Sequence, residues 1–240
     1  MRVLVTRPQE DAERTARRLA ALGYEAVLAP VTSIVSTGEP APLLRADALV
    51  LTSAHAVPAL AQLSDVAYRP VFAVGARTAA AIREAGFKSV HAAKGDALSL
   101  AALVRQHVEP GHTLLHLAGR DRKEEPERSL LAAGYAVTVW EVYEARAAPR
   151  LPEAAAAGLA AGEIDAALHY SRRNTAILIA LCEKAGLLER LRAVTHICLS
   201  EDVAAPLTAS EARAFLAAEP REDSLLSALE EFRRSPRPIS

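Results

Sequence analysis

The sequence predicts an α/β protein of two flavodoxin-like lobes, each a parallel sheet flanked by helices, joined by a two-crossing linker with a cleft between them. Two observations predict this fold. Short apolar segments that end in a polar residue or glycine alternate with amphipathic helical segments, as in βαβ units. Three of these segments each occur twice, and 240 residues suffice for two lobes of about 100–150 residues each.

The repeated segments are circularly permuted along the chain. A segment of the third kind comes first, followed by the first, second and third kinds and then by the first and second again. This order arises if one domain is interrupted by a whole second copy and then resumed. The matching pairs are 47–53 with 165–171, 72–75 with 197–200, and 113–117 with 2–6.

We therefore expect a discontinuous first lobe and an inserted second lobe. The two crossings are predicted to be linkers that can be extended and paired with each other. The basic, proline-containing end of the chain cannot pack and is expected to be disordered. The expected boundaries are 1–34 plus 148–232 for lobe one, 38–143 for lobe two, 35–37 and 144–147 for the linkers, and 233–240 for the tail.

Unalternated apolar runs predict strands that are covered on both faces. Between them, Ala12 and Leu19 share one helical face before Gly23, which is placed to end that helix. The second copy repeats this arrangement before Gly134, and a helix over 154–161 opens the resumed lobe. The strands are expected at Val3–Val5, Ala48–Leu51, Val71–Val74, Leu114–Leu117, Ala166–Leu168 and Ile197–Leu199.

Charge and composition restrict the function. The formal net charge is -1, so no basic field recruits nucleic acid. Cys182 and Cys198 lack the ligand spacing of a zinc site, which favours buried free thiols. The first residues reach Arg7 without the apolar core of a signal peptide, and no apolar run approaches the roughly 20 residues that span a bilayer. We expect a cytoplasmic protein with no membrane or nucleic-acid partner.

Polar residues and glycines follow each predicted strand, where ligands bind in open parallel sheets. Arginines recur beside them, and together with helix N-termini they suit an anionic ligand. For each hydroxyl the alternative is a role as helix N-cap. The candidates are Thr6, Arg7, Thr52, Ser53, His55, Gly75, Arg77, Thr78, Gly119, Arg120, Arg122, Ser171, Arg172 and Ser200.

Familiar catalytic and nucleotide-binding motifs are missing from the sequence. It contains no GxGxxG after a strand, no GxxxxGK[ST] and no HExxH. No Ser-His-Asp or Cys-His pairing is indicated either. An enzyme of this design would work mainly by binding and positioning its substrate.

The motifs together resemble the uroporphyrinogen-III synthase family over nearly the whole chain. None is specific alone, but their order and spacing are. They are Val-Leu-Val-Thr-Arg-Pro at 3–8, Leu-Val-Leu-Thr-Ser at 49–53, Val-Gly-Ala-Arg-Thr-Ala at 74–79, Ala-Gly-Arg at 118–120, Val-Tyr at 142–143 and Tyr-Ser at 170–171.

The resemblance implies a two-lobed, monomeric lyase (a hydro-lyase) without metal or cofactor, active in tetrapyrrole biosynthesis. Its substrate would be hydroxymethylbilane, a linear tetrapyrrole with eight carboxylates. The family removes water, inverts the terminal pyrrole ring through a proposed spiro intermediate, and closes the macrocycle as uroporphyrinogen III. Tyr143 matches the family tyrosine at the lobe junction, where its phenol could assist departure of the hydroxyl as a weak general acid. The alternative is that its ring only packs at the linker.

One segment departs from the family pattern. Residues 199–204 read Leu-Ser-Glu-Asp-Val-Ala, where the family usually has Ile-Gly-x-Thr-Thr-Ala. We expect Glu201 and Asp202 to point outward in the first turn of a helix, where carboxylates are favourable. The alternative is that the resumed lobe contributes less to binding.

Three other functions remain to be weighed. A catalytically silent tetrapyrrole- or anion-binding protein fits every feature except Tyr143 and the complete set of arginines. A periplasmic solute-binding protein shares the twice-crossed plan but needs an export signal. A signalling receiver needs an acidic pocket at its strand ends, where this chain has Thr6, Thr52 and Gly119.

Overall fold

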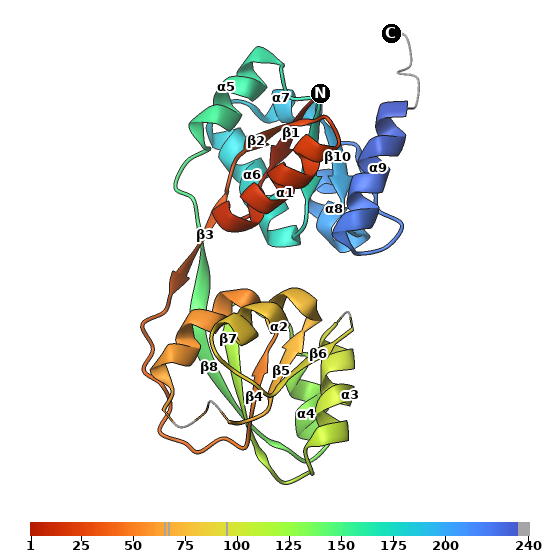
Figure 1. The fold of residues 1–240 in the computed structure, drawn as a ribbon. Coiled ribbons are helices and arrows are strands. Elements are labelled where there is room, and N and C mark those ends of the chain that lie inside the picture. The colour runs from red at the N-terminus through yellow and green to blue at the C-terminus, as the bar shows by residue number, and fades with distance from the viewer. Residues whose placement is uncertain (65, 67, 95, 235–240) are drawn as a thin grey trace. The chain divides into compact units, whose positions relative to one another are not determined.

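The computed structural model describes residues 1–64, 66, 68–94 and 96–234. The chain divides into two compact units, each built on one sheet with helices on both faces (Figure 1). Unit 1 combines Met1–Ser33 with the chain from Arg146 onward, and unit 2 is Ile34–Ala145. The predicted α/β class with two helix-flanked, largely parallel sheets is confirmed. The cleft expected between the two lobes stays a prediction.

The sheet of unit 1 has the strand order β11-β10-β9-β1-β2, and all its paired strands are parallel. Its strands are β1 (Arg2–Val5), β2 (Glu25–Leu28), β9 (Ala166–His169), β10 (Thr195–Cys198) and β11 (Ala214–Leu216). Its helices are α1 (Gln9–Ala21), α5 (Glu153–Ala161), α6 (Arg172–Lys184), α7 (Leu188–Arg192), α8 (Glu201–Ala209) and α9 (Glu222–Arg234).

The alternation of side chains along β1 divides the core of unit 1 into two layers. Val3 and Val5 pack with α1 and α9, whereas Leu4 packs with α5, α6 and α7. Because successive strand residues point to opposite faces, both layers require apolar side chains. The continuous apolar run of β1 is the consequence.

Unit 2 has the strand order β3-β8-β7-β4-β5-β6. Its strands are β3 (Thr32–Ser36), β4 (Ala48–Leu51), β5 (Val71–Val74), β6 (Val90–Ala93), β7 (Thr113–Gly119) and β8 (Ala136–Ala147). A 3-10 helix, η1 (Ala54–Gln62), and α2 (Gly75–Glu84) pack with Leu49 and Leu51 on one face. On the other face α3 (Ala97–His107) and α4 (Glu127–Ala132) pack with Ala48 and Val50.

The expected helix ends agree with the structure. Gly23 and Gly134 follow α1 and α4 with φ of +78° and +87°, a left-handed conformation that glycine adopts without strain. The expected linker residues 35–37 and 144–147 lie largely in β3 and β8, which are hydrogen-bonded neighbours. No helix in the described ranges is long and apolar enough to cross a membrane.

Two expectations are corrected. The strand expected at Ile197–Leu199 runs from Thr195 to Cys198, because Leu199 already leads into the cap of α8. The tail is expected from residue 233, but residues 233 and 234 belong to α9. Arg233 lies over the Tyr24 ring at 5.1 Å and pairs with Glu230, which holds this end of the helix. Residues 235–240 of the expected tail lie outside the described residues.

Candidate functional site

The candidate site in unit 2 lies where β7 ends beside β8. The two strands are parallel, and an irregularity between Ala118 and Gly119 shifts their register so that Gly119 pairs with Tyr143. The backbone N–H of Arg120 then donates to the carbonyl of Tyr143 at 2.9 Å. The backbone of Tyr143 is therefore fixed beside the carboxyl end of β7, where ligands bind in parallel sheets.

The side chain of Tyr143 is half-buried and packs against the core that η1, α2 and the sheet share. Burial raises the pKa of its phenol, and a hydrogen bond with the Ser53 side chain partly offsets that rise. The His55 ring meets the Tyr143 ring edge-on, with centroids 5.8 Å apart. The phenol thus stays protonated at neutral pH and can donate a hydrogen bond or a proton.

Ser53 has a second role as the N-cap of η1. Its hydroxyl accepts a hydrogen bond from the backbone N–H of His55 at 3.3 Å. The serine is therefore fixed by the helix start, and it in turn fixes the phenol. Thr52, half-buried, precedes it directly after β4.

The next strand end, after β5, opens α2. Gly75 is the first residue of the helix, with φ of +74°. Arg77 is exposed in the first turn, while Thr78 is buried. The first N–H groups of a helix lack partners within it, so this end favours negative charge.

Carboxylates surround the arginines that follow β7. Arg120 forms ion pairs with Glu39, Glu141 and Glu144. Arg122 forms ion pairs with Glu127 at 2.8 Å and Glu141 at 2.7 Å. An incoming carboxylate must therefore compete with side chains that already hold these guanidinium groups. Sequence reasoning missed these acids, because nothing in a linear sequence pairs Glu141 with residues 19 and 21 positions earlier.

In unit 1 the arginine after β1 is also held by acids. Arg7 pairs with Glu222 at 3.0 Å and Asp11 at 3.6 Å, and its guanidinium lies 4.1 Å from the centroid of the Tyr170 ring. Glu222 also accepts from Thr15 at 2.7 Å and from Tyr170 at 2.9 Å. Arg7 thus already binds a carboxylate, one supplied by α9.

The other predicted residues of unit 1 serve as caps and surface pairs. Ser171 caps α6 and Ser200 caps α8, so the N-cap alternative describes both hydroxyls. Arg172 pairs with Asp202 at 3.2 Å, and both are exposed. Thr6 is buried, and its carbonyl accepts from Asn174 at 3.4 Å. The binding roles of these residues stay predictions.

The departure at residues 199–204 has a structural explanation. Glu201 and Asp202 open α8 as exposed residues of its first turn, as expected. Their carboxylates lie near the positive end of the helix, where they are favourable. Asp202 also holds Arg172, so the replacement of a family threonine by Asp202 alters the charge available to a ligand at this end of unit 1.

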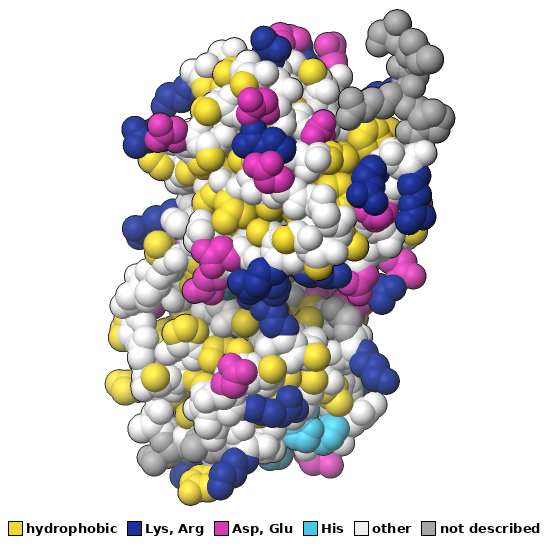
Figure 2. All heavy atoms as spheres, turned by 45° about the horizontal axis from the view of Figure 1, so that its top comes forward, with side chains coloured by type: hydrophobic (Ala, Val, Ile, Leu, Met, Phe, Trp, Pro, Cys, Tyr) yellow, Lys and Arg dark blue, Asp and Glu magenta, His cyan; other side chains and the backbone are white. Residues whose placement is uncertain are grey.

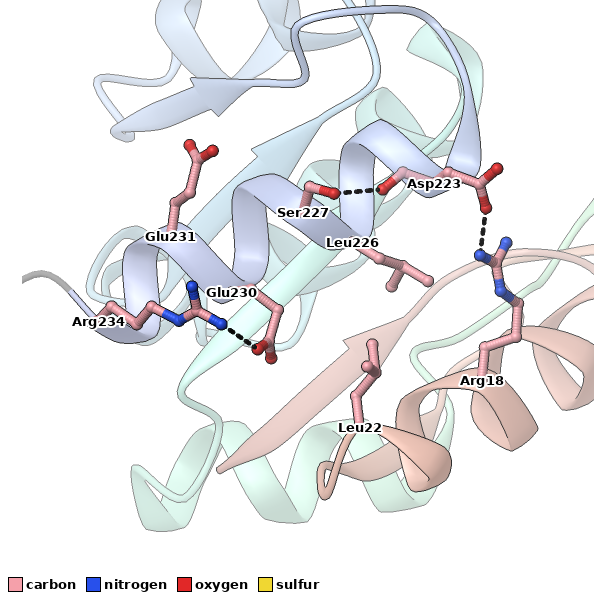
Figure 3. A pocket seen from close by; sticks show the side chains of 8 residues that line it. All are labelled: Arg18, Leu22, Asp223, Leu226, Ser227, Glu230, Glu231 and Arg234. Atoms are coloured by element: carbon pink, nitrogen blue, oxygen red, sulfur yellow. Dashed lines mark hydrogen bonds and ion pairs between the residues drawn. The ribbon is translucent and has the colours of Figure 1, made fainter.

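A groove of about 510 Å³ lies between α1 and α9 of unit 1 (Figure 3). Leu22 and Leu226 contribute its apolar part, and ion pairs from Arg18 to Asp223 and from Arg234 to Glu230 run along it. Its lining contains three acids and two arginines, because Glu231 adds a further carboxylate. This balance repels a polycarboxylate, so the groove is not the candidate site.

Charges of both signs alternate over the face drawn in Figure 2, where Lys and Arg side chains lie among Asp and Glu side chains. The mixture agrees with the formal net charge of -1. Recognition of an anion must therefore come from local groups, since no broad positive field is present on this face.

The two units and their strand orders define a class of protein, the α/β proteins in which one parallel-sheet unit is inserted into another. Several solved structures share this fold, including the following two. The uroporphyrinogen-III synthetase of Helicobacter pylori matches with a TM-score of 0.66 and 17% identity, covering 97% of this chain and 100% of that one. A mutant uroporphyrinogen III synthase of Thermus thermophilus matches with a TM-score of 0.55 and 22% identity, covering 98% of each chain.

The family itself is shown by the sequence. The family model described as uroporphyrinogen-III synthase HemD matches residues 13–227. The chain therefore belongs to the uroporphyrinogen-III synthase family, and its function is that of the family, within porphyrin biosynthesis. A comparison with curated protein sequences gave no significant match.

Proposed function

We propose that the chain is a lyase that converts hydroxymethylbilane into uroporphyrinogen III and one molecule of water. The carbon–oxygen bond of the hydroxymethyl group breaks and the oxygen leaves as water. The methylene of the first ring then bonds to the substituted α-carbon of the last ring, and the bond from that carbon to its former methylene breaks. The freed methylene bonds to the unsubstituted α-carbon of the same ring, and the proton that this carbon loses balances the water. We further propose that the protein is a monomer and that it acts in the cytoplasm without a cofactor. The observation that carries the proposed reaction is the half-buried Tyr143 phenol, held by Ser53 beside the carboxyl end of β7.

Tyr143 is proposed to donate its proton to the departing hydroxyl. Its raised pKa keeps the phenol protonated at neutral pH, which is the form a general acid requires. A hydroxymethylpyrrole loses its hydroxyl readily, because the ring nitrogen stabilises the electrophilic azafulvene that results. Acid assistance is therefore a modest factor, and the larger task is to bring the substituted carbon of the last ring to the methylene of the first ring.

The eight substrate carboxylates are proposed to bind at the strand ends, most strongly in unit 2. Arg77, the N–H groups that open α2 at Gly75, and the hydroxyls of Thr52 and Thr78 lie after neighbouring strands of one sheet. A hydrogen bond to a charged group contributes about 1.5–3 kcal/mol. Several such bonds are enough to hold a flexible tetrapyrrole in one pose.

The paired arginines are proposed to exchange partners when substrate binds. Arg120 and Arg122 share Glu141, so a substrate carboxylate would replace one carboxylate by another. Such an exchange gains little free energy, and it favours the substrate that supplies several carboxylates together. In unit 1, Arg7 and Arg172 are held in the same way by Glu222 and Asp202. Thr6, Ser171 and Ser200 complete the proposed set.

The identity of the product tests the proposal. Purified protein is added to a system that generates hydroxymethylbilane, and the oxidised products are separated by chromatography. We expect the type III isomer in place of the type I isomer that forms spontaneously. Type I alone at saturating protein would refute the proposed reaction and favour the non-catalytic tetrapyrrole-binding alternative.

A further inference from the structure

Gly119 lies against the ring of Tyr143 more closely than any side chain could. A Cβ atom built on Gly119 would lie 2.7 Å from Cε2 and Cζ of Tyr143 and 2.9 Å from its hydroxyl oxygen. These separations are shorter than the carbon–carbon contact distance of about 3.5–4.0 Å. A substitution at residue 119 must therefore displace the ring.

The backbone of Gly119 does not itself demand glycine. Unlike Gly75, it is not in the left-handed region, so alanine could adopt its conformation. The space beside the residue, and not its backbone, is what excludes a side chain. Gly158 in unit 1 is a comparable case, because a Cβ there would lie 2.8 Å from Cδ1 of Ile164.

The Tyr143 ring has little room to yield. Its backbone is held by the pairing with Gly119 and by the 2.9 Å hydrogen bond from Arg120. Its ring packs on the core of unit 2 and faces the edge of His55. The ring must therefore rotate or shift, and either movement takes the hydroxyl away from Ser53.

We propose that Gly119 is a positioning residue, whose missing side chain leaves the slot that holds the Tyr143 hydroxyl against Ser53. The proposal rests on the proposed function, in which that hydroxyl assists the departure of the substrate hydroxyl. It gives Gly119 a role distinct from contact with the substrate. Gly119 acts through Tyr143 and need not touch the reacting atoms.

A double-mutant cycle tests this role with Gly119→Ala, Tyr143→Phe and the double variant. The measured quantities are kcat and KM for hydroxymethylbilane and the melting temperature. We expect both single variants to lower kcat by similar factors, of about 10²-fold or less. The double variant should be no slower than the slower single variant, with KM changed less than kcat. Gly158→Ala, crowded to the same degree against Ile164, should leave kcat unchanged.

Three outcomes of the mutant cycle overturn the proposal. One is a normal kcat in a well-folded Gly119→Ala variant when Tyr143→Phe is impaired, and another is a double variant whose loss is the product of the single losses. If Gly119→Ala fails to fold, Tyr143→Ala is added to remove the ring. The Gly119→Ala/Tyr143→Ala variant should then have the melting temperature of Tyr143→Ala alone. The third outcome is a Gly119→Ala/Tyr143→Ala variant that still fails to fold, because the clash would then involve a group other than the Tyr143 ring.

A second readout separates this proposal from the acid role of Tyr143. Tyrosine labelled with ¹³C at Cζ reports the environment of the phenol without any substrate. Gly119→Ala should shift the Tyr143 resonance and change its titration midpoint, because the phenol leaves its present burial and its contact with Ser53. If Tyr143→Phe keeps full activity, the acid role fails, while the resonance still decides the positioning. A Tyr143 signal unchanged by Gly119→Ala would overturn the positioning role alone.

Discussion

The chemistry of Tyr143 depends on three features of its surroundings. Burial opposes ionisation of the phenol, Ser53 hydrogen-bonds it, and the His55 ring borders it. Burial, the largest of these influences on the pKa, keeps the phenol protonated. The residue is therefore suited to donate one hydrogen bond or proton and to return to its starting state.

Replacing Tyr143 by phenylalanine removes the hydroxyl and keeps the ring. We expect Tyr143→Phe to keep its fold and its affinity for a product analogue while its turnover falls. General acids contribute about 10²–10⁴-fold, and the easy departure of this hydroxyl places the loss at the lower end or below. Steady-state rates and thermal melts on the same preparations check the result.

Tyr143→Ala is the matched comparison, because it also removes the ring from the core of unit 2. Its melting temperature should fall together with its activity. A well-folded Tyr143→Phe variant with full activity would contradict the acid role. The ring would then serve packing alone, and positioning would be the only catalytic device of the protein.

At this scale the sequence predicted which residues follow the strands but not what each one contacts. Ser53, Ser171 and Ser200 have the same position in the pattern, and all three are N-caps. Of the three, Ser53 also contacts Tyr143. The sequence pattern could not predict this contact, because Tyr143 lies 90 positions later in the chain. The arginine partners were unpredictable for the same reason.

At the scale of elements, one carboxylate of α9 gathers several polar contacts with the rest of unit 1. Glu222 in its first turn accepts from Thr15, Tyr170 and Arg18 and pairs with Arg7. Burial opposes the charge of Glu222, but the hydrogen bonds from Thr15 and Tyr170 and the charge of Arg7 outweigh it and lower its pKa. The carboxylate therefore stabilises the fold above its unfolded-state pKa, and this contribution is lost as pH falls through the folded value.

Removing the charge of Glu222 should destabilise unit 1. For Glu222→Gln we expect the free energy of unfolding in urea at pH 7 to fall by about 1–3 kcal/mol, since Arg7 and Arg18 lose a partly buried partner. Glu219→Gln is the control, because Glu219 is exposed and pairs only with exposed Arg221 among the described ion pairs. Its effect should stay within about 0.5 kcal/mol. Equal stability of the two variants would contradict the role of Glu222.

The strands differ in how visible they are in the sequence. The six predicted strands are β1, β4, β5, β7, β9 and β10, which are the interior strands of the two sheets other than β8. Their segments are mainly apolar because both faces are covered. The edge strands β2 and β11 are partly exposed, so their composition resembles that of loops. The long strand β8 mixes polar and apolar residues and extends into the expected linker.

At the scale of the whole molecule, the repeated segments predicted the architecture, whereas the contacts that hold each unit together are non-local. Arg7 and Glu222 are 215 positions apart, and Arg2 donates its backbone N–H to Asp165 across 163 positions. Such pairings follow from the interrupted connectivity, in which the resumed chain completes the sheet begun by β1. A pattern read along the chain predicts the units but not these pairs.

The core of unit 1 also contains two histidines that no ligand explains. Nε2 of His169 lies 2.9 Å from Nδ1 of His196, and both rings are fully buried. Nδ1 of His169 meets the Thr175 hydroxyl at 3.2 Å, and Nε2 of His196 meets the Leu191 carbonyl at 3.0 Å. One proton between the facing nitrogens satisfies both rings when they are neutral. A second proton there would place a charge in the core.

This pair predicts a loss of stability in mild acid. Burial lowers the pKa of His169 well below its ordinary value and that of His196 to about 4. The unfolded chain binds these protons below about pH 6.5. In the folded chain His196 binds its proton only near pH 4, and His169 binds its proton only well below its ordinary range. The free energy of unfolding should therefore be highest above pH 6.5 and fall toward pH 4, by up to about 1.4 kcal/mol per pH unit for each proton.

Urea unfolding at pH 7 and pH 5 measures this dependence. The His169→Leu/His196→Leu variant removes both titrating groups but leaves partners for the atoms they contacted. The Thr175 hydroxyl can donate to the carbonyl of Ser171, and the Leu191 carbonyl still accepts from the N–H of Val194. It should lose less stability between the two pH values than the parent protein. His112→Gln, at an exposed position, should keep the parent dependence. His116 in unit 2 is also buried, and burial lowers its pKa. Because every variant keeps His116, a difference in pH dependence between the variants belongs to the His169–His196 pair. An identical pH dependence in the double-leucine variant would show that the pair is not its source.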